Sequence, residues 1–180
     1  MRGLVAPGTT TAGTPMFTLP AGQTKPAQFD YIAAEAANGF SYIGLGSSGG
    51  ANIDVRTVPG AYLSVQAMFY PEPYANWTSL SLVNSWAWIN LGNHATPSYT
   101  KSADGVVTLK GIIKKATNDD GTTIATLPVG YRPKEQLLIS CVAFGAYCRL
   151  DIMPDGRIID NTSANNGWLS LDNINFMAEQ

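Results

Sequence analysis

The chain has 180 residues, of which only 13% are charged, and it contains 18 glycines and 11 prolines. Few charges with many Gly and Pro residues are typical of short strands joined by tight turns, which excludes a mainly helical protein. The formal net charge of −2 comes without any basic cluster, so nucleic acid is not an expected partner.

The N-terminal segment MRGLVAPGTTTAG (1–13) has no long apolar core of the kind found in signal peptides. No later apolar run approaches the length of a membrane span. We therefore expect a protein that is made in a cytoplasm and is not inserted into a membrane.

A phrase from the start of the chain returns later. GTPMFTLPAG (13–22) lies over GTTIATLPVG (121–130) position by position, and Gly3 lies over Gly111 in the same register. A shared order of glycines and alternating apolar residues indicates two tandem copies of one module.

Further along, the match between the two copies continues in a slightly shifted register. There GAYLSVQAMFY (60–70) lies over NGWLSLDNINF (166–176), and the turn SSGG (47–50) lies over MPDG (153–156). The match thus extends over most of residues 1–70. PEPYAN (71–76), with its two prolines, then forms a stiff spacer before the second copy, residues 77–180.

The second copy shows the alternation and turn residues of an all-β module. About eight short strands without helical periodicity predict an antiparallel β-sandwich or jelly-roll-like barrel. The predicted elements are a strand pair or long bent strand over 77–89, a hairpin over 99–115 that turns at Ala103-Asp104-Gly105, strands over 123–127 and 157–160, a hairpin of 136–143 with 147–152, and a last strand over 168–176.

The first copy is predicted to lack the opening strands of the module, because MRGLV (1–5) aligns with LKGII (109–113). Three explanations stay open: the chain is a fragment of a longer protein, translation starts inside a gene, or another chain supplies the missing strands. A truncated sandwich exposes an unpaired strand edge, which promotes aggregation unless another strand covers it.

The cysteines and the histidine are too few for a tetrahedral metal site, so we expect no metal and no cofactor. Cys141 and Cys148 would face each other if the hairpin turned at Phe144 and Gly145. Free buried thiols and a cross-strand disulfide both stay open, with free thiols the commoner state. His94 stands in a loop rich in Gly, Asn and Pro, where we expect a solvated side chain and not a catalytic base.

The carboxylates also give no sign of an enzyme. Two of them could in principle hydrolyse a glycan. However, each candidate stands beside or near a glycine in a predicted turn, as turn-forming residues do. These are Asp104, Asp119, Asp120 and Asp155.

Aromatic and amide side chains are the better candidates for a binding surface. Trp88 and Tyr147 are evenly balanced between a core position and stacking on a sugar, whereas Trp77 and Trp168 favour the core because each stands beside Leu or at a strand boundary. The loop NTSANNG (161–167) offers uncharged amides suited to a saccharide or to water. The candidate ligand-binding residues from these segments are Trp88, Tyr147, Asn161, Asn165 and Asn166.

Five segments in order resemble a C-terminal module of bacteriophage and prophage tail fibres and receptor-binding proteins. The resemblance covers essentially all of residues 77–180 and, in a degenerate form, residues 2–70. The segments are WTSLSLVNSW (77–86), YTKSADGVVTLKG (99–111), TLPVGYRP (126–133), MPDGRI (153–158) and NNGWLSLDNINF (165–176).

This resemblance implies a β-rich domain on the surface of a virion, usually a homotrimer, that contacts other virion proteins and a bacterial surface polysaccharide. Within TLPVGYRP it adds Tyr131 and Arg132 as candidate ligand-binding residues. The corresponding GQTKPAQ (22–28) of the first copy lacks this pair. If the loop contacts the receptor, only the second copy retains the contact.

The leading interpretation is a non-enzymatic tail-fibre or receptor-binding protein that attaches to a bacterial surface glycan. One alternative is a capsid decoration protein or head fibre, in which the first copy anchors the second to the particle. Another is an internally initiated C-terminal fragment that assists trimer assembly of a full fibre.

Overall fold

The computed structural model divides the chain into two compact units, which we call the first unit (Met1–Tyr74) and the second unit (Ala75–Gln180). In the first unit it describes the backbone of residues 4–5, 14–18, 30–36, 39–45, 50–54 and 63–64, and in the second unit residues 76–90, 92, 94–115, 121–144, 146–161 and 167–179. The regular elements among these residues are all strands, paired antiparallel, which confirms the all-β class.

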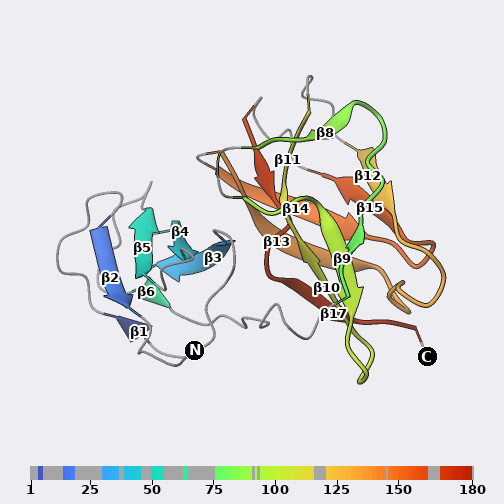
Figure 1. The fold of residues 1–180 in the computed structure, drawn as a ribbon, viewed down its shortest axis with the longest axis horizontal. Helices are drawn as coiled ribbons and strands as arrows, with labels where there is room; N and C mark the ends of the chain where they lie inside the picture. The colour runs from blue at the N-terminus through green and yellow to red at the C-terminus, as the bar shows by residue number, and fades with distance from the viewer. Residues whose placement is uncertain are drawn as a thin grey trace. The chain divides into compact units, whose positions relative to one another are not determined.

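The strands of the first unit form one six-stranded sheet in the order β1-β6-β3-β4-β5-β2. Its longest strands are adjacent in sequence and form a hairpin (Figure 1). The strands are β1 (Leu4–Val5), β2 (Thr14–Thr18), β3 (Asp30–Ala36), β4 (Gly39–Leu45), β5 (Gly50–Asp54) and β6 (Leu63–Ser64).

The second unit contains a four-stranded sheet, β17-β10-β9-β7, and a seven-stranded sheet, β12-β15-β14-β13-β16-β11-β8 (Figure 1). Its strands are β7 (Thr78–Ser79), β8 (Trp86–Trp88), β9 (Ser98–Lys101), β10 (Val106–Lys110), β11 (Ile112–Lys115), β12 (Thr122–Thr126), β13 (Leu137–Ala143), β14 (Ala146–Ile152), β15 (Arg157–Asp160), β16 (Leu169–Ser170) and β17 (Ile174–Met177).

β13 pairs with β14 along seven positions, which confirms the hairpin predicted from 136–143 and 147–152. β9 pairs with β10 across a turn that ends at Gly105, but the hairpin predicted over 99–115 ends at Lys110, because β11 pairs with β16 and β8 in the other sheet. Asp155 forms the turn into β15, because its carboxylate accepts the backbone N–H of Arg157 at 3.1 Å. Asp104 and Asp155 therefore stand in turns, as their neighbouring glycines predict, whereas Asp119 and Asp120 lie outside the described residues.

The single last strand predicted over 168–176 is wrong, because two strands in different sheets occupy this region. Asn173 takes a positive φ of 62°, which an extended strand does not allow. The Asp172 carboxylate accepts the backbone N–H of Gly111 at 2.6 Å and the Ser170 hydroxyl at 2.9 Å. These bonds hold the chain where it passes from β16 in one sheet to β17 in the other.

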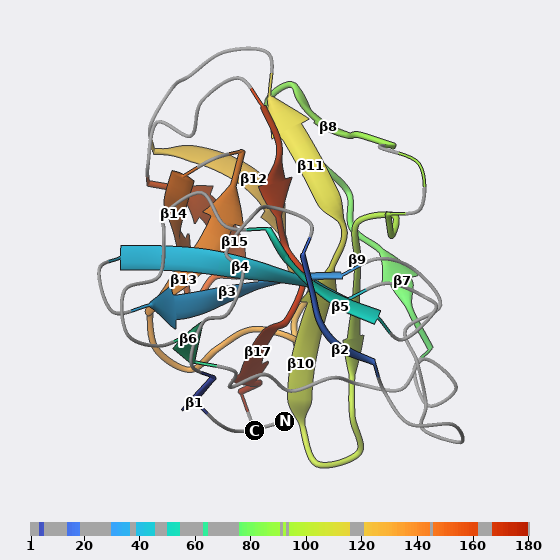
Figure 2. The ribbon, with the colours of Figure 1, turned by 90° about the vertical axis from the view of Figure 1, so that its left-hand side faces the viewer.

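The region 77–89 likewise serves both sheets. β7 pairs with β9 in the four-stranded sheet, and β8 pairs with β11 in the seven-stranded sheet. Asn84 and Ser85 between them have positive φ values of 54° and 63°, so the chain turns sharply there. Figure 2 shows β8 alongside β11, whereas β7 lies beside β9.

The core of the second unit is made by the apolar side chains that alternate along its strands. Val107 and Leu109 of β10 are fully buried, as are Leu150 and Ile152 of β14. Burying each such side chain contributes about 1.5–3 kcal/mol relative to leaving it exposed. The two sheets therefore enclose one shared hydrophobic core, with one sheet nearly closed like a barrel.

The sheet of the first unit and six strands of the seven-stranded sheet share strand order and register. Ala36 pairs with Leu63 in the first unit, as Ala143 pairs with Leu169 in the second. Each sheet also has one irregularity at the same place: between Pro15 and Phe17 in β2, and between Thr123 and Ala125 in β12. In this correspondence β1, β2, β3, β4, β5 and β6 match β11, β12, β13, β14, β15 and β16.

The strand pairing also corrects one detail of the sequence alignment. Ile43 pairs with Ile53 as Leu150 pairs with Asp160, so Ile43 corresponds to Leu150 and Ile53 to Asp160. Gly50 pairs with Thr18 as Arg157 pairs with Thr126, so the predicted match of Gly50 with Gly156 is wrong by one position. Residues 47–49 of this predicted match lie outside the described residues.

Candidate functional site

The Tyr131–Arg132 loop is held by contacts from several elements of the second unit. The Tyr131 ring packs edge-on against Tyr99 at 5.0 Å, and the Lys101 ammonium lies 4.9 Å from the same ring. The Arg132 Nε donates to the Leu127 carbonyl at 3.0 Å. Both predicted residues thus have structural partners in this fold.

The chain's end reinforces this loop. The Glu179 carboxylate accepts the backbone N–H of Gly130 at 2.7 Å, and the Lys101 ammonium donates to the Gly130 carbonyl at 2.7 Å. A side chain at Gly156 would collide with the Leu127 carbonyl and would meet Arg132 Nε at 2.9 Å. The loop is therefore fixed before any ligand arrives.

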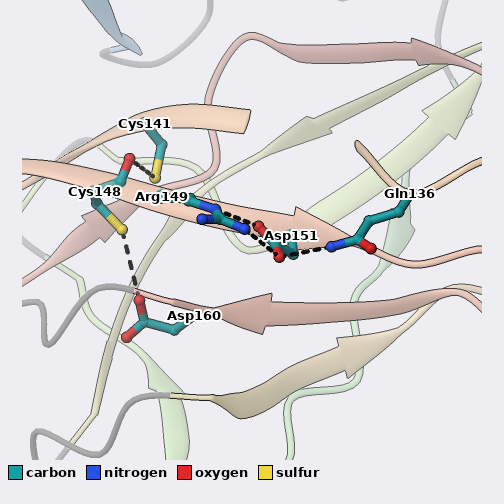
Figure 3. A network of polar contacts seen from close by, with 6 residues as sticks. All are labelled: Gln136, Cys141, Cys148, Arg149, Asp151 and Asp160. Atoms are coloured by element: carbon teal, nitrogen blue, oxygen red, sulfur yellow. Dashed lines mark hydrogen bonds and ion pairs between the residues drawn. The ribbon is translucent and has the colours of Figure 1, made fainter. Parts of the chain in front are cut away.

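A second polar group, which we call the Asp151 network, consists of Gln136, Arg149, Asp151 and Asn161. Arg149 donates to both carboxylate oxygens of Asp151, from Nε at 2.8 Å and from Nη2 at 2.9 Å (Figure 3). Gln136 Nε2 donates to the same carboxylate at 2.9 Å. The backbone N–H of Asn161 donates to the Arg149 carbonyl at 3.0 Å, which places Asn161 beside this pair.

The Asp151 network lies on the face of the sheet that points away from the core. Side chains alternate along a strand, and Cys148, Leu150 and Ile152 of β14 are the ones buried inside. Arg149 keeps 42% of its side-chain surface exposed, whereas Asp151 keeps 5% because its partners cover it. The result is a guanidinium held at a fixed position on the outer face.

The carboxyl of Asp151 is held in its ionised form by these neighbours. The hydrogen bond from Arg149 lowers its pKa, against the opposing effect of burial, and the Arg149 charge and the amides of Gln136 and Asn161 lower it further. A bidentate pair of this kind fixes the orientation of the guanidinium as well as its position. The network is therefore preorganised at neutral pH.

The inner face behind this network carries the two thiols. Cys141 and Cys148 stand directly opposite each other in β13 and β14, and both are free, so the disulfide that the sequence left open is not formed here. Cys148 Sγ lies 3.7 Å from a carboxylate oxygen of Asp160 (Figure 3). Burial raises the pKa of the Cys141 thiol, and its contact with Cys148 raises it further, so it stays protonated at neutral pH.

The remaining predicted binding residues are dispersed. Trp88 is 43% exposed on β8. Tyr147 pairs with Val142 through its backbone, and its side chain is outside what the structure describes. Asn161 belongs to the Asp151 network, whereas Asn165 and Asn166 lie outside the described residues. Of the predicted residues, Tyr131 and Arg132 thus stand together in one loop, and Asn161 stands beside Arg149, which the sequence did not single out.

Three other sequence expectations can be compared with the structure. Trp77 is half-buried with the Lys110 ammonium 4.1 Å from its ring, and Trp168 is half-buried beside Phe144. The prediction that His94 is solvated is wrong, since this residue is only 8% exposed. The segment after His94 is also packed against the core: the Pro97 carbonyl accepts the Leu80 backbone N–H at 2.9 Å. The Pro97 backbone lies so close to Gly111 that no side chain fits there.

Sequence reasoning missed Gln136, Arg149 and Asp151. Their signal lies in the comparison of the two copies in the register that the strand pairing sets, where Tyr42 and Gly44 occupy the positions of Arg149 and Asp151. The sheet therefore forms its register without this ion pair. Residues that differ so strongly between matching strands are candidates for a function beyond folding.

Within the described part of the chain, no three His, Cys, Asp or Glu side chains gather where they could hold one metal ion. None of the described residues belongs to a helix long and apolar enough to cross a membrane. In comparisons with known proteins, no family model, no curated protein and no solved structure matches this chain.

Proposed function

We propose that this chain is a receptor-binding component of a phage tail fibre that attaches to a glycan on a bacterial surface without cleaving it. The ordered segments that resemble tail-fibre modules support this proposal. So does the all-β fold, whose sheets present side chains outward from a rigid core.

The observation that carries the proposal is the Asp151 network. It places a half-exposed guanidinium on the outer face of β14, held by hydrogen bonds of 2.8 and 2.9 Å to Asp151, with the Gln136 amide bonded to the same carboxylate at 2.9 Å. Hydroxyl groups of sugars bind well to groups of this kind, because a fixed donor loses little entropy on binding. The first unit has Tyr42 and Gly44 at the matching positions, so the second unit carries the attachment site.

Two further elements belong to this proposal. The two units are tandem copies of one jelly-roll-like module, as their common strand order and register suggest. The chain assembles as a homotrimer on the virion, beside other virion proteins. Three weak glycan sites on one particle would raise the apparent affinity through effective concentration.

The proposal can be tested with the fluorescently labelled full chain on a panel of bacterial strains. We expect adsorption to particular strains and competition by surface polysaccharide extracted from the same cells. Arg149→Lys should weaken adsorption at least tenfold, because Lys keeps the charge but cannot make the planar bidentate contact. Trp88→Ala tests whether this exposed aromatic ring extends the site.

Met177→Ala provides the matched control, because Met177 is 51% exposed on β17 in the other sheet. It should leave adsorption unchanged. Equal adsorption by wild type, Arg149→Lys and Trp88→Ala would contradict the proposed site. Absence of adsorption to every strain would contradict receptor binding and favour the decoration-protein alternative.

A further inference from the structure

Residues 80–88 join the two sides of the seven-stranded sheet in the second unit. At one side Trp88 pairs with Ile113 and Trp86 with Lys115, both in β11. At the other side Leu82 forms a bridge with Ala125 of β12, and the Val83 N–H donates to the Ile124 carbonyl at 2.9 Å. This segment therefore satisfies the backbone groups of β11 and β12 together.

The same segment contributes to the core. Leu80 is 6% exposed and Trp86 is 7% exposed, and both belong to the buried cluster, against which Leu82 also packs. Asn84 adds a polar contact, since its Nδ2 donates to the Thr123 carbonyl at 3.0 Å. Alternate apolar anchors with backbone hydrogen bonds between them are the features by which an added strand is recognised.

In the first unit β1 and β2 take the places of β11 and β12. Leu4 and Val5 pair with Ser64 and Leu63, as Ile112 and Ile113 pair with Ser170 and Leu169. Among the described residues of this unit, β1 and β2 are the outermost strands of the sheet. Residues 1–74 contain no tryptophan, and no stretch there repeats the pattern of LSLVNSWAW (80–88).

We propose that the first unit accepts, between β1 and β2, a strand that lies outside residues 1–180. The incoming strand carries the pattern of residues 80–88: two leucines two positions apart, followed by Asn and then Trp. The occupant is identified by the second unit, in which such a strand occupies the matching place. This proposal is independent of the glycan-binding role of the second unit.

The first unit has backbone carbonyl groups at the positions that receive the strand in the second unit. Met16 and Pro15 of β2 correspond to Ile124 and Thr123, whose carbonyls accept bonds from Val83 and Asn84. Pro lacks a backbone donor but keeps its carbonyl, so Pro15 is compatible with this role. An accepted strand would also cover edges that otherwise promote aggregation.

The probe is a synthetic peptide with the sequence of residues 77–90, WTSLSLVNSWAWIN, added to the full chain. We expect it to bind with one peptide per chain and to slow amide hydrogen exchange in β1 and β2 at least tenfold. Exchange in β8 and β12 should not change, because the second unit holds its own strand. The control peptide carries Asn in place of Leu80, Leu82 and Trp86 and should not bind.

Four outcomes would overturn the proposal. The first is the absence of peptide binding, and the second is slowed exchange in the second unit alone. The third is equal binding of the control peptide, which would show that the apolar anchors do not select the strand. The fourth is a full chain that forms a stable dimer in which β1 and β2 are already protected from hydrogen exchange. This result would assign the place between β1 and β2 to a second copy of the chain.

Discussion

Each unit contains a sheet of the same strand order and register, but the residues at several matching positions differ. Ala36 and Leu63 keep the pairing of Ala143 and Leu169, yet Ile53 stands where the second unit has Asp160. Positions that agree between the units are explained by folding: Gly111, for example, has a φ of 113° and leaves no room for a side chain beside Pro97. Some positions that differ, such as those of Arg149 and Asp151, are candidates for a role besides folding.

The buried apolar positions should show the largest effects. Leu150 is fully buried and corresponds to Ile43. Leu150→Ala should lower the free energy of unfolding by about 2–5 kcal/mol. Leu150→Ile, the residue type of the first unit, should cost less than about 1.5 kcal/mol. All four tryptophans lie in the second unit, so chemical denaturation followed by Trp fluorescence reports on this unit alone.

Equal destabilisation by Ala and Ile at position 150 would show that the two sheets do not share this core position. That result would break the correspondence between the units, since a shared position should accept the residue of either copy.

Gly156, in the turn between β14 and β15, should show the next largest effect on stability. Gly156→Ala combines a φ of 91° with a collision against the Leu127 carbonyl, so we expect the free energy of unfolding to fall by about 2–3 kcal/mol. Gly121→Ala is the control, because its φ is 73° but no atom lies within 4 Å of the added carbon. It should cost about 1 kcal/mol, for strain alone. The same fluorescence titration measures both, and a larger loss at Gly121 would contradict the packing of the Leu127–Arg132 loop on this turn.

A smaller effect is expected on how the free energy of unfolding depends on pH in acid. The pKa of Asp151 is lowered in the folded protein, chiefly by Arg149, so its contribution to stability is present above the unfolded pKa near 4 and is lost as the pH falls through the folded value. Asp151→Asn should therefore flatten the fall in Trp-detected stability below about pH 4. Asp104→Asn, at an exposed turn, is the control, and an unchanged curve for Asp151→Asn would refute the network's ionic character.

Local sequence signals predicted the hairpins, but not how the two sheets are divided. Asp104-Gly105 and Asp155-Gly156 mark turns by their own chemistry, so β9–β10 and β14–β15 follow from the sequence. The break between β16 and β17 depends on Asp172 reaching Gly111, 61 residues away, and no local pattern announces such a contact. The phase of the apolar alternation shifts between Leu171 and Ile174, which marks the end of one strand but not the partner that Asp172 finds.

The candidate site was predicted only in part, for a similar reason. Tyr131 and Arg132 were identified by the resemblance of their loop, and Asn161 by its amide-rich surroundings. Arg149 and Asp151 look like ordinary charged residues on a strand until the pairing of β13 with β14 brings Gln136 beside them. Their significance emerges from the comparison with Tyr42 and Gly44, which requires the register observed in the paired strands of both units.

The most direct test of the account gives the second unit the residues of the first at the Asp151 network. The variant combines Arg149→Tyr with Asp151→Gly, and its binding to polysaccharide from a strain that adsorbs the wild-type chain is measured by titration calorimetry, with Trp-detected unfolding as a check of the fold. The account predicts a folded second unit whose affinity falls at least tenfold. A folded variant that binds the polysaccharide as tightly as the wild type would contradict it.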